Sequence, residues 1–121
     1  MLISSKKAFT MVELIFVIVV IGILAAIAVP KLAATRDDAK IAKARAAVGA
    51  LRSAIATERQ KRILAGNFTD ITAAQAIALL EYPLGSDWSN LTWTAPDGTT
   101  CTFTVTNNKL AGTCAAMGSD L

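Results

Sequence analysis

The most marked pattern in the chain is a long apolar run near its start. The segment from Phe9 to Val29 holds 21 residues, and its one charged side chain is Glu13. About 20 apolar residues suffice for a helix to cross the roughly 30 Å hydrocarbon core of a bilayer. The run therefore predicts a membrane-spanning helix from about Phe9. Because Pro30 lacks a backbone donor and crowds the preceding turn, we expect a kink or local break between Ala26 and Pro30.

Beyond Pro30 the apolar residues become periodic. Their spacings of three and four residues place them on one face of a helix. They are Ile41, Ala44, Val48, Leu51 and Ile55. The first strong stop signal is Gly66–Asn67, so we expect one continuous long helix that ends near Leu64.

A short second helix is predicted from Thr72 to Leu80. Thr72 is followed three residues later by Gln75, which is the spacing of a capping box. The turn-forming residues 82–85 (YPLG) end this helix.

The last third of the chain alternates between apolar and polar residues, which is typical of strands. We expect three strands, at Leu91–Ala95, Cys101–Thr106 and Lys109–Cys114. Asn107–Asn108 predicts a two-residue hairpin loop. For Leu91 and Trp93 to share the apolar face of the next strand, the first hairpin needs an odd-numbered loop, and PDGTT (96–100) supplies five residues.

This register places Cys101 directly opposite Cys114. At a non-hydrogen-bonded position their Cα atoms would lie about 4.5 Å apart, at the short end of the disulfide range. We therefore expect a disulfide if this part of the chain lies outside the cytoplasm. The apolar face of the sheet then covers the amphipathic half of the long helix, which gives an α+β fold.

Composition narrows the functional classes. A chain of 121 residues without histidine lacks the commonest general base and metal ligand. Between Lys31 and Arg62 nine basic residues face three acidic ones, a charge of +6, whereas residues 63–121 carry one Lys and five acids, a charge of −4. A solvated helix face explains the basic stem most simply. Attraction between the stem of one copy and the head of another, or contact with an anionic polymer such as DNA, are the functional alternatives.

Residues 6–14 read KKAFTMVEL and lead directly into the apolar run and Pro30. The basic leader, the fixed offset from Phe9 to Glu13 and the otherwise uninterrupted span together resemble the N-terminus of type IV pilins and type II secretion pseudopilins. The resemblance covers about residues 6–32, roughly a quarter of the chain. It identifies the chain as similar to a family of structural subunits, not of enzymes, and implies no cofactor.

In that family a prepilin peptidase cuts before a phenylalanine, methylates the new N-terminus and leaves glutamate as the fifth mature residue. The resemblance implies a leader of residues 1–8 with Lys6 and Lys7 as its charges, cleavage between Ala8 and Phe9, and methylation of Phe9. The residue before the cut is usually glycine, and Ala8 departs from that pattern. Gly22 and Pro30 also match the family and would let the helix unwind as subunits slide together.

The offset between Phe9 and Glu13 has a physical meaning in such a protein. Cleavage creates an amine on Phe9, one helical turn from Glu13, and a carboxylate among packed apolar helices is tolerable only beside a cation. The amine of a neighbouring subunit would pair with Glu13 and set the register of the two helices. A pair within one helix is the alternative.

The resemblance also implies partners and location. Residues 9–30 would anchor the subunit in the bacterial inner membrane with a cytoplasmic N-terminus, and residues 31–121 would form a periplasmic or extracellular head. The partners would be further copies of the chain, other pilins, the prepilin peptidase and an inner-membrane assembly platform. A type IV pilus subunit, a type II secretion pseudopilin and a minor or competence pilin that contacts DNA remain open.

Other interpretations start from the same residues. A secretory signal peptide would use Ala26-Ile27-Ala28 as its cleavage site, and an ordinary membrane anchor would leave the position of Glu13 unexplained. An enzymatic head lacks a recognisable nucleophile, phosphate loop or metal-ligand spacing. Asp87, Asp97 and Asp120 could supply oxygens to calcium, although solvated loop acids explain them better. We expect Trp88 and Trp93 to belong to the head core or to contacts between subunits.

Overall fold

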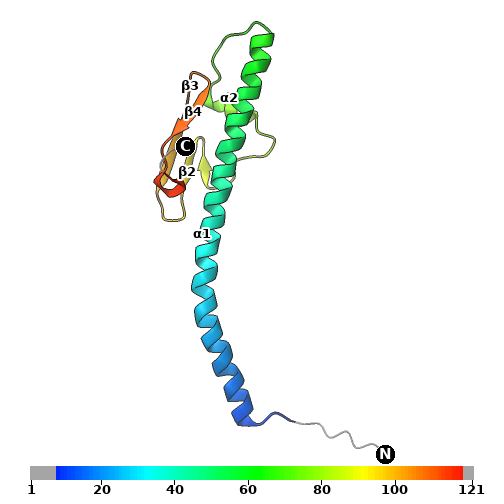
Figure 1. Ribbon diagram of the computed structural model, residues 1–121, viewed down its shortest axis with the longest axis vertical. Coiled ribbons are helices and arrows are strands. Elements are labelled where there is room, and N and C mark those ends of the chain that lie inside the picture. The colour runs from blue at the N-terminus through cyan, green and yellow to red at the C-terminus, as the bar shows by residue number, and fades with distance from the viewer. Residues whose placement is uncertain (1–7, 119–121) are drawn as a thin grey trace, which may run out of the picture. The chain divides into compact units, whose positions relative to one another are not determined.

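A computed structural model of the chain describes residues 8–118 (Figure 1). Residues 1–7 and 119–121 lie outside the described part, and with them the predicted leader charges Lys6 and Lys7. The chain divides into two units, residues 1–36 and residues 37–121, which we describe separately.

Helix α1 runs from Met11 to Leu64 and contains 54 residues, close to the predicted length. In the first unit it carries the apolar run, and each residue from Met11 to Arg36 is exposed. The helix is continuous across Pro30, so a local break is excluded there, whereas the alternative of a kink stays a prediction. Proline removes a single donor, and the hydrogen bonds of the turns on either side maintain the helix there.

The amphipathic half of α1 supplies the helical side of the core in the second unit. Its buried residues are Ala44, Val48, Leu51 and Ile55, with Ile41 partly buried beside them, as the spacing predicted. Leu51 is fully buried. The residues between these positions are mostly charged or small, so only one face of the helix is apolar and only one face is covered.

The C-terminus of α1 is closed by the predicted glycine. Gly66 has a positive φ of 75°, and its N–H donates to the Ile63 carbonyl at 3.0 Å. The N–H of Asn67 donates to the Arg62 carbonyl at 2.8 Å. This pair of bonds is a Schellman motif, which needs a residue that tolerates the left-handed region at the position of Gly66.

Helix α2, from Ala73 to Ala78, follows the predicted capping box. The Thr72 hydroxyl accepts from the Gln75 N–H, and the Gln75 side chain accepts from the Thr72 N–H at 3.1 Å. Ala76 packs into the core, and its small side chain lets this short helix approach closely.

The sheet is antiparallel and has four strands in the order β1-β2-β3-β4, one strand more than predicted. It lies along one side of the head portion of α1 (Figure 1). Its strands are β1 (Trp88–Ser89), β2 (Thr92–Thr94), β3 (Thr100–Thr106) and β4 (Lys109–Gly112). The additional strand β1 is only two residues long and turns into β2 through Asn90, whose φ is 57°. A pair of residues is too short to show the alternation by which strands are detected in a sequence.

Both hairpins have the predicted loop parity. In β3–β4, Val105 pairs with Leu110 and Thr106 with Lys109, so Asn107–Asn108 is the two-residue loop, and both asparagines have positive φ. In β2–β3, Trp93 pairs with Cys101 and Thr94 with Thr100, which requires an odd loop.

The expected PDGTT loop is nevertheless wrong by two residues in its register. Ala95 and Thr99 close a tighter loop, 96–98, in which Gly98 has a φ of 86°. A three-residue loop with glycine in the left-handed position is a favoured hairpin connection, and a shift of two residues preserves which side chains face the core.

The apolar face of the sheet completes the core of the head. Leu91, Trp93, Cys101, Phe103 and Leu110 are all buried against the α1 face, whereas Thr102, Thr104 and Thr106 point outward. The predicted α+β fold is confirmed. One face of one sheet covers one face of one helix.

A disulfide joins Cys101 to Cys114, as the register predicted, with the two Cα atoms 5.1 Å apart. The bond leads into a short 3₁₀ helix, Ala115–Met117, whose last residue is buried. The guanidinium of Arg45 on α1 donates from both Nε and Nη2 to the Met117 carbonyl, with the Nε bond at 2.9 Å. The end of the described chain is thus attached both to the sheet and to α1.

We predict that Cys101→Ala/Cys114→Ala lowers the free energy of unfolding of the head by about 3 kcal/mol. The disulfide joins residues 13 positions apart, and closing a loop of that size reduces the conformational entropy of the unfolded chain by about this amount. Urea unfolding of the detergent-solubilised chain, followed by circular dichroism, measures the change. The parent chain treated with dithiothreitol should show the same midpoint as the double variant. An unchanged midpoint in both samples would contradict a stabilising role.

Candidate assembly site

The first half of α1 is an apolar surface without a covering element in the described chain. Phe16, Leu24 and Ile27 are 68%, 61% and 66% exposed, and the other large side chains of this half are similar. Among the described residues α1 alone is a helix long and apolar enough, by length and composition, to cross a membrane. An exposed apolar surface of this extent marks a site that contacts lipid or protein.

The residues at the start of α1 are held by a helix cap. Residues 8–10 are not helical, and α1 begins at Met11. The Thr10 carbonyl accepts from the Leu14 N–H at 3.1 Å, and the Thr10 hydroxyl accepts from the Glu13 N–H at 3.2 Å. Thr10 is therefore the N-cap residue, and Glu13 is the third residue of the helix.

This capping role of Thr10 was not recognised in the sequence. The signal was present, because a threonine followed three residues later by a glutamate is the same capping-box spacing as Thr72 and Gln75. The cap fixes where the helix starts, with Phe9 directly before it and Glu13 in its first turn.

The predicted scissile bond lies in the non-helical segment. Ala8 and Phe9 precede the N-cap, and the Phe9 side chain is 77% exposed. Both residues thus lie outside the hydrogen-bonded turns of α1, and cleavage between them stays a prediction. Thr10 marks the boundary between this segment and the helix.

Glu13 lies on the exposed surface of the apolar run, and no residue from 8 to 118 forms an ion pair with it. A carboxylate in the first turn is favoured by the partial positive charge at a helix N-terminus. That interaction is weak compared with the cost of about 3 kcal/mol for a charge in the centre of a hydrocarbon layer. A cation beside the carboxylate would offset this cost when α1 is covered, and whether the amine of Phe9 comes from the same chain or from a neighbour stays a prediction.

Gly22 and Pro30 lie on the same exposed stretch. A Cβ on Gly22 would have no neighbouring atom within 4 Å, so nothing in the isolated chain requires glycine there. The helix likewise continues through Pro30. Neither residue has a structural role in the described chain, and a role in assembly stays a prediction for both.

The head contains no cluster of metal-ligating side chains among the described residues. The Asp97 carboxylate accepts from the backbone N–H of Thr99 at 2.9 Å, within the β2–β3 loop. This backbone hydrogen bond, reinforced by the Thr99 side chain, lowers the pKa of Asp97. Asp97 therefore stabilises the β2–β3 turn. Asp87 forms no metal-ligand cluster with it, and Asp120 is outside the described residues.

The two tryptophans belong to the head core. Trp93 is buried, and Trp88 is half-buried with its ring centroid 5.9 Å from that of Phe103. Both side chains are used in packing against the sheet, which leaves no exposed pair of rings for a stacked ligand.

Comparison with known proteins agrees with the N-terminal pattern and extends beyond it. Residues 3–29 match the family described as the prokaryotic N-terminal methylation motif. The chain is also 42% identical over 109 residues to the type IV narrow pilus major component PilA5 of Thermus thermophilus, an alignment that covers 88% of this chain and 83% of that protein. No solved structure matches the chain significantly.

Proposed function

The chain belongs to the type IV pilin family, and we propose that it is a structural subunit of a type IV pilus-like filament. The observation that carries this proposal is the apolar half of α1, which is exposed throughout in the single chain and has one carboxylate four residues from a predicted processing site. Packed copies of the same helix would cover that surface, as lipid would before assembly. We assign the chain no enzymatic activity.

The first step of the proposed assembly is removal of the leader, residues 1–8. The peptidase would cut between Ala8 and Phe9 and methylate the amine of Phe9. The match to the methylation motif and the non-helical conformation of residues 8–10 support this position. Alanine has a side chain nearly as small as that of glycine, so a pocket built for glycine would accept Ala8 with reduced efficiency.

The second step is pairing between subunits. The amine of Phe9 in an incoming copy would lie beside Glu13 of its neighbour, which offsets the two chains by four residues in sequence. A different offset would leave both charges buried without a partner, a loss of several kcal/mol. The pair would therefore select one register among helices whose apolar surfaces fit in many.

The proposed topology follows from the same segment. Residues 9–30 would span the inner membrane before assembly, with the leader in the cytoplasm, and residues 31–121 would form the head on the far side. The head disulfide supports a location outside the cytoplasm, since such bonds persist in oxidising compartments. After assembly the head would face the outside of the filament.

A filament subunit is favoured over a secretion pseudopilin or a minor pilin. The relative that aligns along most of the chain is named as the major component of a narrow pilus. This proposal predicts many copies per filament and surface filaments that are lost when the gene is deleted.

We predict a mature N-terminus at Phe9, which mass spectrometry of the membrane-purified protein would show as loss of residues 1–8 and gain of one methyl group. Ala8→Gly should raise the mature fraction, because it restores the residue usual before the cut, and Ala8→Leu should block cleavage because a large side chain does not fit a pocket for glycine. A start at Val29 would indicate a signal peptide instead, and an intact Met1 would indicate a simple anchor.

We predict that Glu13→Ala and Glu13→Gln leave cleavage and membrane insertion intact and lower filament yield about 100-fold, the equivalent of about 3 kcal/mol for an unpaired buried amine. Glu13→Asp, which keeps the charge, should retain more filaments than Glu13→Gln, which keeps the size. Filaments sheared from cells are quantified by immunoblot, with the membrane fraction as the control for expression. Parental yield from Glu13→Gln would refute the pairing.

A further inference from the structure

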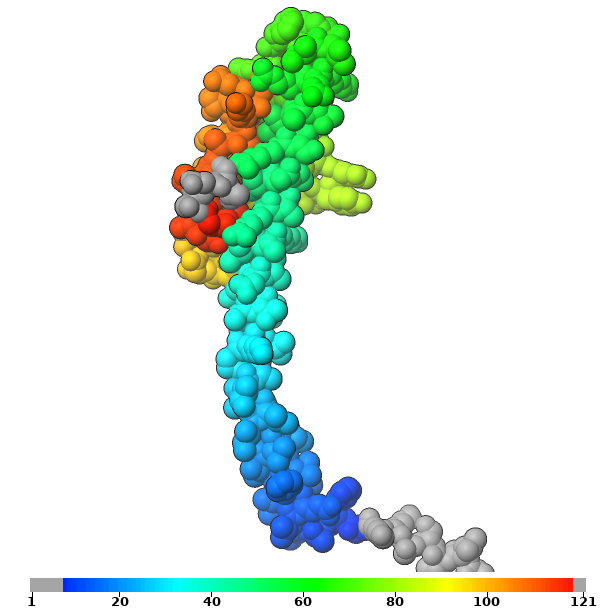
Figure 2. All heavy atoms as spheres, viewed as in Figure 1, coloured from blue at the N-terminus to red at the C-terminus, as the bar shows by residue number. Residues whose placement is uncertain are grey.

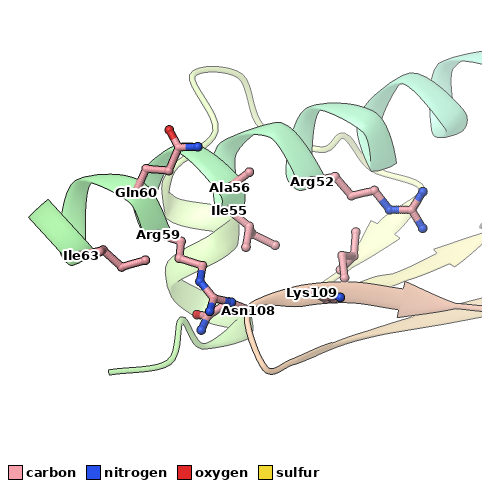
Figure 3. Close-up of a pocket in the computed structure, with 9 residues that line it drawn as sticks. Arg52, Ile55, Ala56, Arg59, Gln60, Ile63, Asn108 and Lys109 are labelled. Carbon is pink, nitrogen blue, oxygen red and sulfur yellow. The ribbon is translucent and has the colours of Figure 1, made fainter. Parts of the chain in front are cut away.

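A cationic groove lies in the head between the last turns of α1 and the β3–β4 hairpin. Its volume is about 530 Å³, within the range of pockets that bind whole side chains or small molecules. Arg52 and Arg59 from α1 and Lys109 from β4 lie along it, and none of its nine lining residues is acidic (Figure 3). The groove is thus positively charged along its length.

The floor of this groove is apolar. Ile55 and Leu110 close it toward the core, and Ile63 remains 44% exposed at its end. Arg59 bridges the two walls, because its Nη1 donates to the Asn107 carbonyl at 3.3 Å. An apolar floor beneath three cations suits an occupant that carries an aromatic or aliphatic side chain next to a carboxylate.

The head itself presents such an occupant on another side. The loop from Leu79 to Leu84, between α2 and β1, carries Glu81 and Tyr82, and the Tyr82 side chain is 76% exposed. Within residues 8–118 the Glu81 carboxylate has no hydrogen bond or ion pair, whereas Glu58 is paired with Arg62, and Asp70 accepts from Asn108. Glu81 and Tyr82 therefore combine an available charge with an exposed ring.

The groove and this loop lie on opposite sides of α1. The loop packs beside Thr57, whereas the groove contains Arg59, and at 100° per residue these two positions are about 160° apart on the helix. Figure 2 shows the yellow-green loop projecting on one side of the helix and the orange β3–β4 hairpin on the other. A chain therefore cannot place its own loop in its own groove.

We propose that the Glu81–Tyr82 loop of one subunit docks in the cationic groove of the next subunit along the filament. The inference rests on the proposed function and adds to it a contact between the globular heads of neighbouring subunits. The two surfaces differ, so the contact is head-to-tail: each subunit offers one loop and one groove, and repetition gives an open filament instead of a closed dimer. The carboxylate of Glu81 meets Arg59 and Lys109, and the Tyr82 ring covers the apolar floor.

The loop and the groove lie at similar levels along the head portion of α1. The α1 residues in the groove run from 52 to 63, and those beneath the loop run from 50 to 58, so the midpoints differ by three to four residues, or about 5 Å. A small axial step between neighbouring heads therefore brings the loop of one to the level of the groove of the other.

Charge reversal tests the contact in full-length protein expressed in cells that assemble the filament. Arg59→Glu and Glu81→Arg should each lower filament yield about 10-fold, and the double variant should recover most of it, because reversed charges attract again. Lys61→Glu is the matched control, since it makes the same change on α1 outside the groove and should leave yield within about twofold. Equal thermal unfolding of the purified variants confirms that the heads fold.

Parental yield from Arg59→Glu would overturn the docking. If those filaments had in addition lost binding to a double-stranded DNA fragment that parental filaments bind, the groove would be a surface for anionic polymers. Absence of filaments from the parental chain would instead remove the proposed function itself.

Cross-linking identifies the two surfaces directly. Gln60→Cys and Tyr82→Cys in one chain, with Cys101 and Cys114 still bonded, should give a ladder of covalent oligomers when intact filaments are oxidised. Lys61→Cys with Tyr82→Cys places the thiol outside the groove and should give monomers. Only dimers, or no product from intact filaments, would overturn the head-to-tail arrangement.

Discussion

The constraint on which the molecule depends is that α1 has more apolar surface than its own chain covers. In the head, four α1 positions are buried by the sheet, whereas in the first unit Phe9, Val20 and Leu32 and their neighbours are all exposed. Apolar surface costs about 25 cal/mol for each Å² left in water, so an exposed helix of this length has no stable state in water alone. Lipid and other copies of the helix are the two environments that cover it, and assembly amounts to transfer from the first to the second.

That transfer is nearly neutral for the apolar side chains, because lipid tails are as apolar as leucine. It is not neutral for Glu13. In the membrane a carboxylate near the start of the helix can reach the headgroup region, whereas among packed helices it needs a cation at a defined position. In the proposed assembly the carboxylate would contribute specificity, and the apolar surface would contribute the affinity. This division would explain why a residue that disfavours burial lies in the segment to be buried.

The sequence was sufficient for much of the fold because its signals are local. The spacing from Ile41 to Ile55 identified the buried face of α1, Gly66 marked its end, and the 107–108 loop placed Cys101 opposite Cys114. The β2–β3 register was wrong by two residues because parity is visible in the alternation of side chains, whereas the choice between loops of three and five residues depends on how Gly98 and Ala95 close the turn. Strand β1 was too short for any periodicity.

The candidate site likewise contains one feature that the sequence predicts and one that it does not. The offset between Phe9 and Glu13 can be read from the sequence because both residues lie on one helix or just before it. The groove could not be predicted from the sequence, because Arg59 and Lys109 are 50 positions apart and come together only when the β3–β4 hairpin packs on α1. The charge asymmetry of stem and head allowed attraction between copies as an alternative to a solvated helix face, and that attraction stays a prediction.

A second contact between subunits also answers a question that Glu13 leaves open. Apolar helices can shift by one turn relative to each other and keep most of their packing. One ion pair of about 3 kcal/mol would then be the interaction that disfavours a shifted register. A loop in a groove would add a modest term of its own, and because both proposed contacts join the same two chains, each would raise the effective concentration of the other. The specificity of the filament would then depend on both contacts together, and neither would have to be strong enough to trap a subunit that arrives in the wrong place.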